Sequence, residues 1–251
     1  MQMLAALLFL GAAICAAGQN PLAVKKNARE QGPVKQNTRT PAATPTPSPV
    51  AAATGATQTA DAVRYAYEYR QKPDFYVTHI LIEHDSTGRG QLTFERRNGT
   101  EPIVEPVELS DAARARINGL WNALRFLDSD KNYQSDRQYP QLGTVNLRMA
   151  QGTRERVAEF NWTDDPNAKA LADEYRRVAD QFMFVFDITV SRENQPLEAP
   201  KLLDQLDTLL TRNGLSDPRQ LTTLLRDLST DERLPLIARH HAERLLKKIE
   251  K

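Results

Sequence analysis

Residues 166–191 form the longest segment after the first eighteen residues in which apolar side chains recur at helical spacing. Positions three or four apart fall on one face of an α-helix, and here the charged residues fall on the other faces. The predicted inward stripe comprises Ala168, Leu171, Ala172, Tyr175, Val178, Ala179, Phe182, Phe186 and Thr189. Thr163 or Asp164 can cap this helix, and Pro166 suits its first turn. A helix of this length with one apolar face has to cover another layer of structure.

The segment before this helix supplies strands. Alternation of inward and outward residues, together with turn signals such as Asn98-Gly99, predicts a first group of strands. These strands span residues 63–70, 75–85 and 91–97, with a short addition at 103–109. Pro102 and Pro106 place this last strand at a sheet edge, because proline cannot donate a ladder hydrogen bond.

A helix capped by Ser110 follows, and then a second hairpin spanning residues 143–150 and 154–162. The inward stripe of this helix comprises Ala113, Ile117, Leu120, Trp121 and Leu124. The order strands, helix, strands, helix predicts an α+β domain over residues 61–195, in which two helices cover an antiparallel sheet of about five strands.

Residues 196–251 are predicted to form a helical C-terminal subdomain. Its helices follow the proline-containing segment of residues 195–200, which ends the α+β domain. These leucine-rich helices are marginally stable alone, so we expect them to dock on the α+β domain or on a partner. The residues of the long helix that turn away from its main stripe, Met183, Phe184 and Val185, are the expected seat. Ser229 and Glu232 have the spacing of a capping box for the last helix.

The first eighteen residues have an uncharged apolar run with small residues at its end, which is typical of a secretory signal peptide and too short to span a membrane. We expect export to the periplasm or the extracellular space, with cleavage near Ala17 or Gly18 and no transmembrane helix in the mature chain. A lipid anchor on Cys15 is an alternative, although the bulky Ile14 precedes it. Because Cys15 is the only cysteine, the mature chain would have no disulfide.

Residues 19–60 are rich in Pro, Thr and Ala and have few large apolar side chains, so they predict a disordered linker. Five basic residues and one acidic residue precede Asp61, a net charge of +4, which leaves −3 for the remainder of a chain whose total is +1. The predicted globular part is therefore mildly acidic, and nucleic acid is not an expected partner.

One loop has the spacing of a calcium site. Oxygen donors occupy its first, third, fifth and ninth positions. These donors are Asp128, Asp130, Asn132 and Asp136. Tyr133 stands where the sharp turn of such a loop requires glycine, and a solvated acidic loop is the alternative interpretation.

The segment from His79 to Asp85 also contains metal-ligand residue types, but His79 and Glu83 would be about 13 Å apart on a strand. Surface or interface histidines are the favoured interpretation, and His84 is expected to point away from His79. The row Tyr65, Tyr67 and Tyr69 could bind a ligand or glycan, but it is more typical of a packed sheet face.

No nucleophile elbow, phosphate loop, dinucleotide fingerprint or glycosidase-like carboxylate pair is present in the sequence. With segments such as Leu142-Gly-Thr-Val-Asn-Leu and the order hairpin, helix, hairpin, helix, residues 78–191 resemble a class of small exported bacterial domains of unknown function. That resemblance implies the fold but no activity.

The sequence therefore favours an exported, non-enzymatic binding or cell-envelope-associated module, with a protein or an envelope polymer as its partner. Two alternatives stay open: an enzyme with an unrecognised site, such as an extracellular hydrolase, and a calcium-stabilised adhesion-type domain. No cofactor other than calcium is suggested by the motifs.

Overall fold

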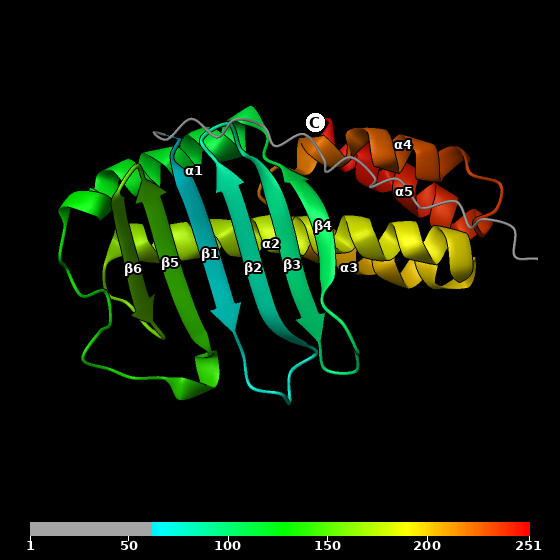
Figure 1. The fold of residues 1–251 in the computed structure, drawn as a ribbon. Helices are drawn as coiled ribbons and strands as arrows, with labels where there is room; N and C mark the ends of the chain where they lie inside the picture. Colours follow the sequence, from blue (N-terminus) through cyan, green and yellow to red (C-terminus); the bar gives the residue numbers. More distant parts are fainter. Residues whose placement is uncertain (1–61) are drawn as a thin grey trace, which may run out of the picture. The chain divides into compact units, whose positions relative to one another are not determined.

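The computed structural model describes residues 62–251. They form an α+β fold with a six-stranded antiparallel sheet and five α-helices (Figure 1). The predicted fold class is confirmed. The predicted signal peptide, residues 1–18, and the predicted linker, residues 19–60, lie outside the described residues.

The sheet has the strand order β4-β3-β2-β1-β5-β6, and every neighbouring pair is antiparallel. The strands are β1 (Arg64–Arg70), β2 (Val77–Asp85), β3 (Arg89–Arg96), β4 (Ile103–Glu108), β5 (Thr144–Gln151) and β6 (Arg154–Phe160). The sheet thus has six strands where about five were expected. β4 lies at an edge, as its prolines predicted, and β1 joins the two hairpin groups by pairing with both β2 and β5.

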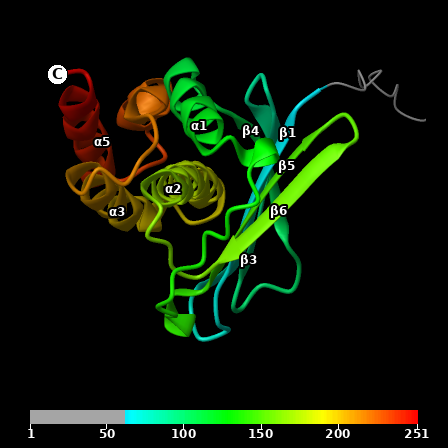
Figure 2. The same cartoon turned by 90° about the vertical axis from the view of Figure 1, so that its left-hand side faces the viewer.

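Two helices cover one face of this sheet (Figure 2). They are α1 (Asp111–Leu124) and α2 (Pro166–Asn194). Their buried stripes form one core with the inward side chains of the strands, including Tyr65, Ile82 and Leu147. The opposite face of the sheet carries no helix from the described part of the chain.

The N-terminal caps of α1 and α2 can be compared with the predicted ones. Ser110 caps α1 as expected, because its Oγ accepts a hydrogen bond of 3.1 Å from the amide of Ala113. The prediction of Thr163 or Asp164 for α2 is wrong: the cap is Asp165, whose Oδ1 accepts from the second and third helical amides at 2.9 Å. The reason is position, since Asp165 directly precedes Pro166, the first helical residue. Thr163 instead accepts from the amide of Asp165.

The C-terminal part of the chain forms three helices with a separate apolar core. They are α3 (Ala199–Thr211), α4 (Thr222–Thr230) and α5 (Leu236–Ile249). Phe184 and Ile188 of α2 are buried in this core and Val185 packs against it, whereas Met183 is buried on the sheet side. The long helix therefore contributes to both cores, and Figure 2 shows α3 and α5 beyond it, farther from the sheet.

The predicted capping box of the last helix is wrong. Ser229 lies inside α4, where its Oγ donates to the carbonyl of Arg226 at 2.7 Å, and α5 begins only at Leu236. Pro235 explains the later start, because the residue before a proline is driven out of the helical conformation. Four short 3-10 helices complete the described chain: η1 (Phe126–Asp128), η2 (Pro140–Leu142), η3 (Pro196–Glu198) and η4 (Pro218–Leu221).

Candidate functional site

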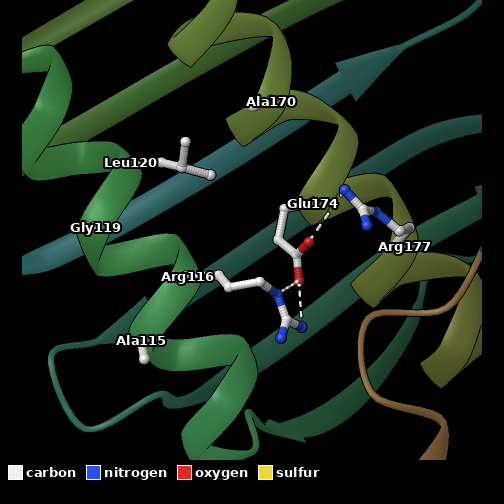
Figure 3. A pocket seen from close by; sticks show the side chains of 7 residues that line it. All are labelled: Ala115, Arg116, Gly119, Leu120, Ala170, Glu174 and Arg177. Carbon is white, nitrogen blue, oxygen red and sulfur yellow. Dashed lines mark hydrogen bonds and ion pairs between the residues drawn. The ribbon is translucent and has the colours of Figure 1, made fainter.

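A hollow of about 400 Å³ lies between α1 and α2 and opens to solvent (Figure 3). We call it the α1–α2 hollow. It is lined by Ala115, Arg116, Gly119, Leu120, Ala170, Glu174 and Arg177. Its residues come from helices that are separated in sequence by the second hairpin, so the sheet beneath them sets their relative position.

Helical periodicity places these residues on the flanks of the two core helices. The buried positions of α1 include Ala113, Ile117 and Trp121, which leaves residues 115, 116 and 119 on its exposed side. On α2, residues 170, 174 and 177 are four and three positions apart and therefore form one ridge beside the core stripe. The same amphipathic pattern that builds the core thus also forms the walls of the hollow.

Glu174 is the buried charge of the site, with only 2% of its side chain exposed. Its Oε1 accepts hydrogen bonds from Arg116 Nε at 3.1 Å, Arg116 Nη2 at 2.9 Å and Ser216 Oγ at 2.7 Å. Its Oε2 lies 3.2 Å from Arg177 Nη2. Figure 3 shows the carboxylate held between the two guanidinium groups. A buried carboxylate needs such partners, because an unpaired charge away from water is strongly unfavourable.

The same contacts connect the hollow to the C-terminal helices. Arg116 Nη2 donates to the carbonyl of Ser216 at 2.6 Å, and Ser216 lies in the turn before η4. Farther along α2, Gln181 accepts from the amide of Asp217 at 2.9 Å. The position of the Arg116 side chain is therefore fixed by α2 and by the C-terminal part of the fold together.

Both arginines keep donors that the described residues do not use. Arg116 donates through Nε and Nη2, and Arg177 through Nε and Nη2, so the Nη1 groups have no partner within residues 62–251. Their side chains are 43% and 30% exposed. Two guanidinium groups facing one carboxylate leave a local charge of about +1, which favours an anionic ligand.

Gly119 is the least expected residue of the hollow. Glycine inside a helix is about 1 kcal/mol less favourable than alanine, so such a position usually has a packing reason. Gly90 in strand β3 shows such a packing reason, because an added Cβ atom would lie 1.8 Å from the carbonyl oxygen of Glu83. A Cβ atom added at Gly119 would meet no atom within 4 Å. The fold does not require this glycine, and its effect is to keep the hollow open.

The chemistry of this site suits binding. The four remaining lining residues, Ala115, Gly119, Leu120 and Ala170, have no polar side-chain atom. The only carboxylate, Glu174, is already paired with both arginines and with Ser216. The arrangement can hold an anion attached to a small apolar group, because it combines unused guanidinium donors with apolar walls.

A second hollow of about 450 Å³ lies between the C-terminal end of α2, α3 and the loop after β1. Tyr76 and Leu202 contribute to its lining. Of its two carboxylates, Asp187 is paired with Arg96 at 2.6 Å, and Glu198 lies 3.8 Å from Lys201. Arg96 also lies against the rings of Phe94 and Phe186. These contacts serve the packing of β3 on α2.

A buried polar network includes one of the histidines of β2. Trp121 Nε1 donates to the hydroxyl of Tyr175 at 2.9 Å, and that hydroxyl donates to His84 Nε2 at 2.7 Å. His84 Nδ1 donates to the carbonyl of Asp85 at 2.8 Å, which fixes the neutral tautomer with hydrogen on Nδ1. Burial lowers the pKa of His84. The prediction that His84 is a surface or interface residue is wrong, whereas its orientation away from His79 is confirmed.

His79 lies on the helix-free face of the sheet. Its Nδ1 is 3.1 Å from Glu95 Oε1, and its Nε2 is 2.9 Å from Glu68 Oε1. The tyrosine row behaves as the packed face of a sheet: Tyr65 and Tyr67 are buried, and Tyr69 packs against the same core. The interpretation of this row as a core face is confirmed.

The loop predicted to bind calcium uses several of its donors elsewhere. Asp128 pairs with Arg154 at 2.5 Å, and Asn132 Oδ1 accepts from the amide of Gln134 at 3.0 Å. Tyr133 turns inward and stacks on Phe126 in the core. Within the described residues, no three His, Cys, Asp or Glu side chains are grouped to hold a metal ion, so Asp128, Asp130 and Asp136 are not brought together. Calcium binding by this loop, with Asn132 as a further donor, stays a prediction.

Across residues 62–251, no helix combines the length and the apolar character needed to cross a membrane. No protein-family model matches the chain, and a search of curated proteins gives no match to its sequence.

Sequence reasoning missed the residues of the α1–α2 hollow. Arg116 and Glu174 are 58 positions apart, and each taken alone has the appearance of an ordinary charged residue on a helix. Gly119 was the available signal, because it is a glycine inside a segment that otherwise predicts a continuous helix.

Proposed function

We propose that this protein is an exported, non-enzymatic binding module of the cell envelope, and that the α1–α2 hollow is its ligand site. The single observation that supports the site most strongly is Gly119, an unfavourable helical residue without a packing reason beside two guanidinium groups with unused donors. Export rests on the sequence of residues 1–18.

The hydrogen bonds and ion pairs that the charged groups already make favour binding over catalysis. A hydrolytic site needs a nucleophile or a general base within reach of a substrate. In the α1–α2 hollow both oxygens of Glu174 already accept hydrogen bonds or ion pairs, and the arginines serve as donors only. Such a set of groups can recognise an anion without transforming it.

The test is capture of partners by residues 19–251, immobilised and exposed to an envelope fraction of the organism that encodes the chain. Two variants serve as the comparison. Gly119→Leu places a branched side chain at the wall of the hollow, whereas Gly119→Ala adds one methyl group. Neither Cβ atom meets a neighbour. Partners kept by the native chain and by Gly119→Ala but lost with Gly119→Leu support the proposal. Equal capture by all three proteins refutes it.

A further inference from the structure

We infer that the ligand of the α1–α2 hollow is the free C-terminal carboxylate of a partner polypeptide whose last side chain is apolar. This inference rests on the proposed binding function and specifies the chemistry of the ligand. It is carried by the two partly exposed guanidinium groups, the apolar walls and the limited size of the hollow.

The charged end of the hollow has guanidinium donors that a second carboxylate can use. Glu174 binds Arg116 through one oxygen and Arg177 through the other, so the two guanidinium groups lie beside a single carboxylate in fixed positions. The planar fork of a guanidinium group matches the geometry of a carboxylate better than a flexible ammonium group does. A ligand carboxylate can accept from the unused Nη1 group of either arginine, while Glu174 keeps both arginines in place.

The apolar end of the hollow limits what is attached to that carboxylate. Its walls are helix flanks with the side chains of Ala115, Leu120 and Ala170, and Gly119 adds no side chain. A volume of about 400 Å³ lies near the lower end of the range for ligand pockets, about 300–1,000 Å³. One or two small residues fit such a space, and a longer apolar chain does not.

The walls also distinguish a chain terminus from the middle of a chain. The backbone groups inside α1 and α2 are used within the helices, so they cannot pair with an extended peptide as a free sheet edge can. A peptide that crosses this open hollow would leave its backbone N–H and C=O groups to water and would gain no backbone hydrogen bond from the walls. A terminus avoids this problem, because its carboxylate meets the arginines and only its last side chain meets the walls.

The experiment titrates labelled protein, residues 19–251, with pairs of short peptides followed by NMR. The probes are acetyl-Ala-X dipeptides in which X is Ala, Val, Leu, Ile, Met or Phe, each as the free acid and as the C-terminal amide. The reporters are the backbone amide of Gly119 and the Nε–H groups of Arg116 and Arg177. We expect saturable shifts with at least one free acid and at least tenfold weaker binding of the matching amide.

Two variants complete the test. In Gly119→Leu, the free acid is expected to cause no shift of the Arg116 and Arg177 Nε–H groups. Arg177→Gln keeps the Arg116–Glu174 pair. Followed at Gly119 and Arg116, its binding is expected to be about tenfold weaker, the effect of losing one charged contact worth about 1.4 kcal/mol. Equal binding of acid and amide, the same response to acetate alone, or no saturable shift with any free acid overturns the inference. The proposed function is judged separately, by the loss of captured partners with Gly119→Leu, so a failure of the inference can be distinguished from a failure of the function.

Discussion

The rings of Tyr67 and Tyr175 stack in the core with their centroids 5.1 Å apart, but only the Tyr175 hydroxyl has hydrogen-bond partners. The Tyr67 hydroxyl is buried without a partner among the described residues. Burial raises the pKa of both phenols, so both are neutral at ordinary pH. Two adjacent tyrosines thus allow a matched comparison of a satisfied and an unsatisfied polar group.

Tyr175→Phe is expected to lower the free energy of unfolding by about 1–3 kcal/mol, because it leaves Trp121 Nε1 and His84 Nε2 buried without partners. Tyr67→Phe removes a hydroxyl that has no partner, so stability should stay the same or rise. Urea unfolding of the two variants measures both effects. A loss of equal size in the two variants would contradict the hydrogen-bond network described for Tyr175.

The pH dependence of stability should report on His84. Its pKa is lowered by burial in the folded state, and the unfolded value is about 6.5. The unfolded state therefore binds the proton more readily, and the contribution of neutral His84 to stability is lost as pH falls from about 6.5 toward the lower folded-state pKa. His84→Gln cannot titrate and should have a flatter profile between about pH 7 and pH 5. Parallel urea-unfolding profiles of the native chain and the variant would exclude this role.

The buried Glu174 should contribute more to stability than either of the partly exposed arginines, Arg116 and Arg177. Glu174→Gln removes the charge that both guanidinium groups share, and we expect a loss of about 1–3 kcal/mol, limited because the arginines can reach water. Arg177→Gln removes one partly exposed ion pair and should lower stability by only about 0.5–1 kcal/mol. Chemical denaturation distinguishes the two. A larger loss in the Arg177 variant would show that Glu174 is not the centre of the cluster.

Substitutions at Gly119 should stabilise the fold. Alanine at an exposed helical position is favoured over glycine by about 1 kcal/mol, and an added Cβ atom meets nothing within 4 Å. Gly119→Ala and Gly119→Leu are therefore both expected to raise the unfolding free energy or the melting temperature. If both variants are destabilised instead, the glycine has a structural role and no longer indicates a ligand site.

Much of the fold could be predicted from periodicity, because strands with alternating apolar residues and helices with apolar stripes each bury one face. Ser110 as a cap, the edge position of β4 and the core role of Tyr67 follow from such local rules. Local rules failed where neighbours along the chain competed. Asp165 displaced Thr163 and Asp164 as the cap, because it directly precedes Pro166.

The candidate site could not be predicted in the same way, since its contacts join distant parts of the chain. The spacing of residues 128–136 indicated a calcium loop, but Tyr133 turns into the core and Asp128 pairs with Arg154 of β6. Alternation along β2 places His84 on the same face as the buried Ile80 and Ile82, but it does not show that Tyr175 of α2 donates a hydrogen bond to it. Periodicity assigns residues to faces, and tertiary packing decides which of them meet.

The most direct test of the α1–α2 hollow as a ligand site is the ratio of partner captured by Gly119→Leu to that captured by Gly119→Ala, measured at equal amounts of folded protein. Both variants remove the glycine and gain helix stability, but only leucine adds a side chain large enough to obstruct the hollow. The account predicts that capture by the leucine variant falls at least tenfold while the alanine variant binds as the native chain does. Equal capture by the two variants would contradict it.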